Sequence, residues 1–143
     1  MANNNLTFAV KRTNIGLGLF ALVPFAAGKR IIEYTGKIIS SDDEIEMSGR
    51  YLFEISDKLA INGKERSNLA RYINHSCRPN AIAYLSGKRV WIWARKNIKA
   101  GEAITIDYGR KYFDDYIRPI GCKCEKCLTK SNSRLDLNGG SKP

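Results

Sequence analysis

The sequence predicts a mostly β fold of small sheets with few short helices. Short β-rich segments recur between residues 8 and 106, and Gly, Pro, Asn or Asp bounds each of them, as is typical between short strands. Helical signals are sparse and no strand alternates with a long helix, which excludes a doubly wound sheet. The predicted strands are Phe8–Val10, Arg30–Tyr34, Tyr51–Ile55, Lys58–Ile61, Ala81–Tyr84, Arg89–Ala94 and Ala103–Ile106.

Two short segments have helical character. Ser41–Met47 opens with Ser-Asp-Asp, which suits a helix cap and the positive end of a helix dipole. Leu69–Ile73 is long enough for one turn. We therefore expect these helices to interrupt the strands without forming a layer of their own.

Length and composition indicate one compact domain. The chain has 143 residues, and 43% hydrophobic residues with 10% aromatics are sufficient for a core. No apolar run approaches the roughly 18–20 residues of a membrane helix, and the N-terminus lacks the basic-then-apolar order of a signal peptide. We expect a soluble, intracellular protein with no membrane partner.

The net charge of +10 suggests an acidic partner such as nucleic acid. Lys and Arg are nevertheless spread from Lys11 to Lys142 without a dense block. A well-solvated basic surface explains this distribution equally well, so charge alone does not identify the chemistry.

Three segments carry candidate functional residues. Gly16-Leu17-Gly18 follows a predicted strand, where paired glycines let backbone amides approach a ligand but also serve any tight turn. Residues Arg71–Asn80 place the only histidine of the chain, His75, in a polar turn that must be hydrogen-bonded. Asp107-Tyr108-Gly109 exposes a phenol at a strand end.

Two enzyme classes do not fit these segments. The Gly16-Leu17-Gly18 segment continues into neither of the Gly-rich phosphate-binding motifs, and no long helix follows it. Nothing near His75 supplies the Cys-His or Ser-His-Asp arrangement of a nucleophilic hydrolase.

Taken together, the motifs resemble those of the SET domain. The resemblance rests on five segments that occur in the order of that family and cover about residues 8–110: Gly16–Gly18, Glu33–Gly36 with Ile38-Ile39, Tyr51–Phe53, Arg71–Asn80 and Gly101–Gly109. It implies small curled β-sheets with a C-terminal pseudoknot, in which the Asn74 segment passes through a loop closed by the C-terminal strand. This departs from the rule that chains do not thread loops.

The resemblance implies a protein-lysine N-methyltransferase that uses S-adenosylmethionine and releases S-adenosylhomocysteine. Tyr108 and Tyr51 are the implied catalytic residues. The implied cofactor-binding residues are Gly16, Leu17, Gly18, Arg71, Asn74, His75 and Tyr108. The implied substrate channel is lined by Tyr51, Phe53, Ile106, Tyr108 and Tyr112, the last from a segment that also offers Phe113 and Tyr116.

One departure from the family pattern concerns the product. The family usually has Phe or Tyr two residues before the tyrosine that corresponds to Tyr108, and this chain has Ile106. Isoleucine cannot hold an ordering water as a phenol can, which favours the addition of more than one methyl per lysine.

Four cysteines suggest a metal site. Cys122, Cys124 and Cys127 are clustered, and Cys77 is the only further thiol that could complete a tetrahedral zinc site. By resemblance to a post-SET segment these four residues are the expected ligands. The two-residue gap between Cys124 and Cys127 is shorter than in the usual post-SET pattern, and free thiols or a disulfide are the alternatives.

The resulting expectation is a minimal, stand-alone SET domain. We expect a flexible N-terminus at 1–7, the SET domain at 8–110, a post-SET zinc segment at 111–128 and a flexible tail at 129–143. The alternative is a non-enzymatic basic module with a degenerate SET fold that binds chromatin or nucleic acid.

The substrate is expected to be a lysine-bearing protein with a basic tail, such as a histone. Segment 41–56, which in relatives lies beside the peptide groove, carries five acidic residues that could receive such a tail, although an exposed acidic helix explains them equally well. Cytoplasm, nuclear chromatin and delivery into a host cell all fit the sequence.

Overall fold

The computed structural model describes residues 6–40, 42–43 and 51–109, and the predicted mostly β fold is confirmed there. Short strands dominate, and the one helical element of the described residues is a 3-10 turn. The elements are β1 (Phe8–Thr13), β2 (Gly16–Ala21), β3 (Arg30–Tyr34), β4 (Lys37–Ser40), β5 (Leu52–Glu54), β6 (Leu59–Asn62), η1 (Leu69–Tyr72), β7 (Asn74–His75), β8 (Ala81–Ser86), β9 (Arg89–Ala94) and β10 (Thr105–Ile106).

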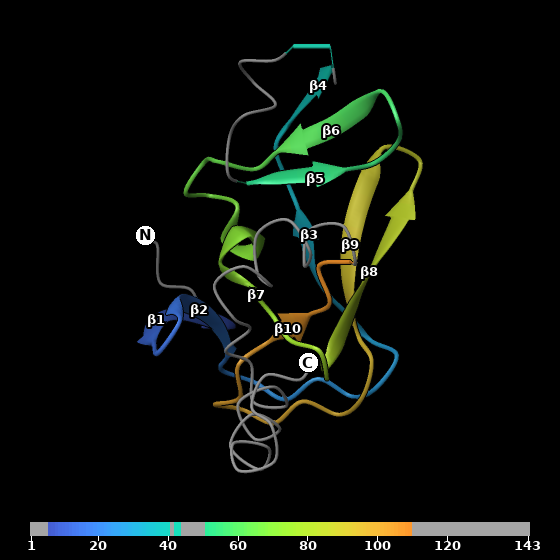
Figure 1. The fold of residues 1–143 in the computed structure, drawn as a ribbon. Coiled ribbons are helices and arrows are strands. Elements are labelled where there is room, and N and C mark those ends of the chain that lie inside the picture. The colour runs from blue at the N-terminus through green and yellow to red at the C-terminus, as the bar shows by residue number, and fades with distance from the viewer. Residues whose placement is uncertain (1–5, 41, 44–50, 110–143) are drawn as a thin grey trace, which may run out of the picture.

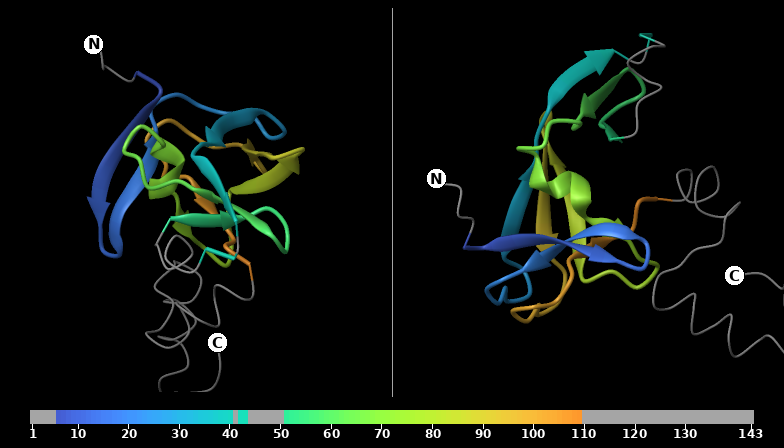
Figure 2. Two further views of the ribbon diagram at one scale, coloured as in Figure 1. Left: turned by 90° about the horizontal axis from the view of Figure 1, so that it is seen from above. Right: turned by 90° about the vertical axis from the view of Figure 1, so that its left-hand side faces the viewer.

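The described strands form four small sheets. β1 and β2 make an antiparallel hairpin, while β3–β9–β8 and β4–β6–β5 are three-stranded antiparallel sheets. β7 and β10 pair in parallel between the hairpin and the β3–β9–β8 sheet (Figure 1). β2 contacts η1, and the two views in Figure 2 show the hairpin beside that turn. The β7–β10 pair thus contacts the hairpin through β2 and the three-stranded sheet through β8.

Most predicted strands are present, some with shifted ends. Arg30–Tyr34 and Arg89–Ala94 have the predicted bounds, and the one-turn helix at Leu69–Ile73 is observed as η1. The predicted Ala103–Ile106 strand is reduced to β10, with Ala103 forming only an isolated bridge to Phe20. The predicted helix Ser41–Met47 lies outside the described residues apart from positions 42 and 43.

Three strands were not predicted. β4 was missed, and β7 lies in a segment that we interpreted as a polar turn. Gly16–Gly18 forms no turn but begins β2, because Asn14 and Ile15 make the hairpin turn, with the Thr13 hydroxyl accepting from the Ile15 N–H at 3.1 Å. Gly16 has φ 108°, a conformation that glycine adopts without strain.

The core lies on one face of the β3–β9–β8 sheet. Side chains alternate along a strand, so Val90, Ile92 and Ala94 of β9 are buried while Trp91 and Trp93 point to the other face. The buried face packs against residues of β2, η1, the η1–β7 connection and β10. This packing places Ile106 of β10 in the core, with β7 beside it.

Within residues 6–40, 42–43 and 51–109, none of the helical structure has the length and apolar character that crossing a bilayer requires.

Candidate active site

The parallel pair of β7 and β10 joins two segments that are far apart in sequence. Asn74 lies opposite Thr105 and His75 opposite Ile106. The Ser76 N–H extends the ladder by donating to the Ile106 carbonyl at 2.9 Å. A parallel pair cannot be closed by a tight turn, and here the connection runs through β8 and β9. The predicted meeting of the Asn-His and Asp-Tyr-Gly segments is therefore confirmed.

His75 is buried and holds the segment after β10. Its Nδ1 accepts from the Tyr108 backbone N–H at 3.0 Å, so the ring proton is assigned to Nε2, which lies 3.4 Å from Cys77 Sγ. Burial lowers the pKa of the His75 imidazole, while the Asp107 carboxylate, 3.8 Å from Nδ1, opposes that shift. The ring is consequently neutral near pH 7.

The Tyr108 side chain is held at its hydroxyl and at its ring. Its hydroxyl donates to the Ile73 carbonyl, and its half-buried ring lies tilted against His75 with 5.3 Å between centroids. Because the hydroxyl proton is committed to a carbonyl, the phenolic oxygen can act toward a further group only as an acceptor. A donor such as an amine N–H could use them.

Asn74 brings the Gly16–Gly18 segment to the same place. Its side-chain N–H donates to the Leu17 carbonyl at 3.1 Å. A Cβ added to Gly18 would lie 3.1 Å from the Asn74 side-chain nitrogen, so a larger residue there would crowd the approach of β2 to β7. No atom of the described residues lies within 4 Å of a Cβ added to Gly16, and Leu17 is exposed. At the start of β2, Gly16 and the Leu17 side chain are thus accessible among the described residues, while the Leu17 carbonyl is bound by Asn74.

Asn80 fastens the segment that leads into β10, a role that we did not predict. It is buried, its side-chain N–H donates to the Ala103 carbonyl at 2.8 Å, and its side-chain Oδ1 accepts from the Thr105 N–H at 2.9 Å. Its own N–H donates to the Thr105 hydroxyl at 3.2 Å. In the sequence, the only sign of this role was that an asparagine ends the polar segment Arg71–Asn80. Its partners could not be predicted, because they lie more than twenty residues away.

Tyr51 and Arg71 form a second group, on the side of η1. The Arg71 guanidinium lies 4.6 Å from the centre of the Tyr51 ring and 4.7 Å from that of Tyr72. It also donates to the Tyr72 hydroxyl at 2.7 Å and to the Lys64 carbonyl. Arg71 is thus engaged by the protein itself, and its role toward a cofactor stays a prediction.

The remaining channel residues are placed as follows. Phe53 packs against Tyr34 at 5.3 Å between ring centroids, and the Tyr34 hydroxyl donates to the Tyr51 carbonyl at 2.9 Å. Ile106 is buried in the core cluster. Tyr112 lies outside the described residues.

Only one of the four predicted zinc ligands lies among the described residues. Cys77 is half-buried after β7, whereas Cys122, Cys124 and Cys127 lie outside the described residues. Among residues 6–40, 42–43 and 51–109 no cluster of three or more His, Cys, Asp or Glu side chains could hold a metal ion. The zinc site stays a prediction.

Comparisons with known proteins agree on one family. The family model described as "SET domain" matches residues 16–109. The chain is 36% identical over 124 residues to the histone-lysine N-methyltransferase trithorax of Drosophila virilis and 37% identical over 128 residues to the histone-lysine N-methyltransferase set1 of Dictyostelium discoideum. These matches cover 78% and 80% of this chain.

The fold is also similar to that of a solved structure. An active polycomb repressive complex 2 in the basal state contains a chain that matches with a TM-score of 0.64 and 29% identity, over 72% of this chain and 15% of that one. This chain spans only 3% and 8% of the lengths of the trithorax and set1 relatives. The similarity therefore concerns one domain of much longer proteins.

Proposed function

This chain belongs to the SET-domain family, and from that membership we propose that it is an S-adenosylmethionine-dependent protein-lysine N-methyltransferase. The observation that carries the proposal is the parallel β7–β10 pair, with His75 holding the Tyr108 backbone while Asn74 holds Leu17. Three segments with candidate functional residues meet there. The names of the relatives, histone-lysine N-methyltransferases, support the activity.

The residues at this place fit the proposed methyl donor. S-adenosylmethionine, when bound, supplies a methyl group on a cationic sulfur, and a neutral His75 avoids placing a like charge beside it. The open start of β2, with Gly16 and the exposed Leu17, offers backbone groups to the donor. Gly18, Asn74 and His75 would complete the binding surface, with Arg71 as a more distant contributor.

Tyr108 is the proposed guide of the attacking amine. Methyl transfer requires an in-line approach, so alignment in a site of fixed dipoles is the main catalytic resource. The phenolic O–H donates to the Ile73 carbonyl, and the phenolic oxygen would accept from the lysine amine, which orients the nitrogen lone pair. A free lysine has a pKa of about 10.4 and must lose its proton to solvent before it attacks.

The lysine channel would be lined by aromatic and aliphatic side chains. We place Tyr51, Phe53 and Tyr108 along it, with Ile106 beneath and Tyr112 from the following segment. Because Ile106 has no hydroxyl to hold a water, we propose that more than one methyl is added per lysine. Mass spectra that show only monomethyl product after exhaustive reaction would contradict this.

We also propose a structural zinc ion bound by Cys77, Cys122, Cys124 and Cys127. Four thiolates are a complete tetrahedral set for zinc. The half-buried position of Cys77 directly after β7 supports this, because the ion would then anchor the cysteine-rich segment beside the proposed site.

The proposed substrate is a basic, lysine-rich protein tail, and histones are the first candidates. The relatives are named for histone lysines, and Glu54 at the end of β5 and Asp57 after it are exposed acidic residues that suit a basic tail. A nuclear, chromatin-associated location follows from this proposal.

The activity is tested by labelled-methyl transfer onto core histones and onto whole-cell lysate. Wild type is expected to label a protein band, and Tyr108→Phe is expected to lower the rate on the order of 100-fold. Tyr84→Phe is the matched control, because it removes the same oxygen from a phenol on the exposed face of β8 and should leave the rate unchanged.

Calorimetry with S-adenosylmethionine separates this proposal from a non-enzymatic module. A chain that binds nucleic acid in a salt-dependent manner but neither binds S-adenosylmethionine nor labels any protein would overturn the enzyme assignment.

A further inference from the structure

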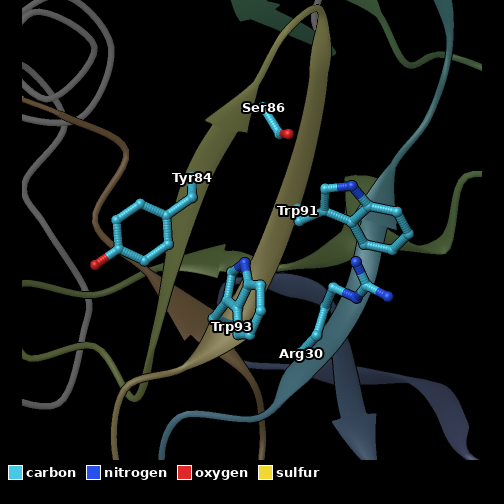
Figure 3. A pocket seen from close by; sticks show the side chains of 5 residues that line it. All are labelled: Arg30, Tyr84, Ser86, Trp91 and Trp93. Carbon is cyan, nitrogen blue, oxygen red and sulfur yellow. The ribbon is translucent and has the colours of Figure 1, made fainter.

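The face of the β3–β9–β8 sheet that points away from the core carries aromatic and arginine side chains around a shallow cavity. The cavity has a volume of about 320 Å³ and is lined by Arg30, Tyr84, Ser86, Trp91 and Trp93 (Figure 3). All three strands contribute, and the register sets Tyr84 opposite Trp91 and Arg30 opposite Trp93. The proposed methyltransferase site does not use any of these residues.

Exposing the apolar side chains of this face to water is energetically unfavourable. Tyr84 is 57% exposed, and the neighbouring Ile82 is also exposed. Trp91 and Trp93 are half-buried and are two positions apart on β9, so their side chains stand on one face roughly 7 Å apart. Grouped exposed aromatics of this kind mark interaction surfaces more often than structural ones.

The charge of this face is positive. The Arg30 guanidinium lies 4.1 Å from the centre of the Trp91 ring and 5.8 Å from that of Trp93. Arg89 lies 5.1 Å from the Trp91 ring and binds Glu33 through two hydrogen bonds of 2.8 and 2.9 Å. Two arginines against one glutamate leave one net positive charge, and the exposed Lys88 of the β8–β9 turn adds another.

These features favour an anionic partner with flat rings. A methylated lysine or another cation would have to displace Arg30 from the tryptophan faces and would meet a surface of its own charge. A nucleic-acid duplex would satisfy the arginines, but its paired bases cannot stack on exposed aromatic side chains. Unpaired bases can do so, while the adjoining phosphates meet the cations.

We propose that this face binds single-stranded nucleic acid. Bases stack on Tyr84 and on the Arg30 guanidinium that covers the Trp91 and Trp93 rings, and phosphates lie against Arg30 and the β8–β9 turn. The inference does not depend on the proposed methyltransferase activity, because it uses the opposite face of the core sheet.

Tryptophan fluorescence of the full chain tests the proposal directly. The chain has two tryptophans, and both lie on this face, so stacking is expected to quench most of the tryptophan emission. Single-stranded oligothymidylate and oligouridylate are the probes, and their comparison shows whether DNA or RNA is preferred. Binding with quenching that weakens as salt is raised supports the proposal.

Two substitutions locate the site. Tyr84→Ala is expected to weaken binding about tenfold, within the range measured for base stacking. Arg30→Ala is expected to weaken binding similarly and to reduce the slope of log affinity against log salt by about 0.7, the value for one phosphate contact on a single strand. Neither should change methyl transfer or binding of S-adenosylmethionine.

Matched controls make the result decisive. Leu85→Ala alters the neighbouring exposed side chain on the opposite face of β8, and Arg66→Ala removes an exposed cation from the β6–η1 connection. Both should bind like wild type. The proposal fails if duplex DNA or polyglutamate binds with equal affinity and quenching, or if Tyr84→Ala and Arg30→Ala bind as tightly as their controls.

Discussion

The backbone N–H of Tyr108 donates to Nδ1 of His75 at 3.0 Å, across 33 positions in the sequence. This bond joins the end of β10 to β7 and places the ring proton of His75 on Nε2, while burial lowers the pKa of the imidazole. A single side chain thus sets both the position of the proposed catalytic phenol and the charge beside the proposed methyl donor.

His75→Ala removes the only side-chain acceptor that the structure shows for the Tyr108 N–H in the described residues. An unpaired buried amide costs about 1–3 kcal/mol, so the melting temperature should fall and S-adenosylmethionine should bind more weakly. Thermal melts and calorimetry measure the two effects. His75→Asn, which keeps an acceptor oxygen, should recover part of the loss, and equal stability of wild type and His75→Ala would contradict the assignment.

Asn80→Ala should destabilise the fold without touching the proposed site. The substitution leaves the Ala103 carbonyl and the Thr105 N–H without their partner, and we expect a loss of about 2 kcal/mol in the free energy of unfolding. Denaturant unfolding measures it. Asn97→Ala is the matched control, because Asn97 makes one exposed hydrogen bond to the Ala27 N–H, and its loss should be clearly smaller.

Gly18→Ala should weaken binding of S-adenosylmethionine. The new Cβ would lie 3.1 Å from both the Asn74 side-chain nitrogen and Thr13 Cγ2, so these side chains must shift by a few tenths of an ångström, which disturbs the bond from Asn74 to the Leu17 carbonyl. Calorimetry should show an affinity reduced about tenfold. In an Asn74→Ala background the same change should have less effect, since one crowding atom is gone, and strict additivity would argue against this coupling.

The Glu33–Arg89 pair predicts a small dependence of stability on pH. The hydrogen bond that Arg89 donates to Glu33 lowers the pKa of the Glu33 carboxyl in the folded chain. A lowered folded-state pKa means that the pair stabilises the fold above the ordinary carboxyl pKa and loses this contribution as pH falls through the lowered value. Melting temperatures of wild type and Glu33→Gln should therefore converge as the pH falls below the ordinary carboxyl pKa of about 4.3. A difference that grows toward acid pH would contradict the pairing.

The proposed zinc ion predicts about one equivalent of metal after gentle purification. Removing it with a chelator should lower methyl transfer, and Cys77→Ser should lower the metal content to the same degree as Cys127→Ser. A metal content below half an equivalent, or a loss in only one of the two variants, would refute the four-thiolate site.

Much of the strand pattern was predictable because the local signals agree. β3 and β9 combine β-branched and aromatic residues between turn residues, so their bounds could be predicted from the sequence. β7 could not, because its two residues have no strand signal of their own and are extended by pairing with β10. β2 was misassigned because two glycines suggested a turn that Asn14 and Ile15 make instead.

The sequence by itself determined the class of fold, the family and the segments that carry the candidate residues, because motif identity and apolar alternation are local properties. Only the tertiary structure decided that His75 is neutral, that the Tyr108 hydroxyl is held by Ile73, and that Arg71 is engaged with Tyr51 and Tyr72. Protonation, hydrogen-bond partners and exposure depend on neighbours tens of residues away. The exposed tryptophan face likewise became visible only when β3, β8 and β9 were paired.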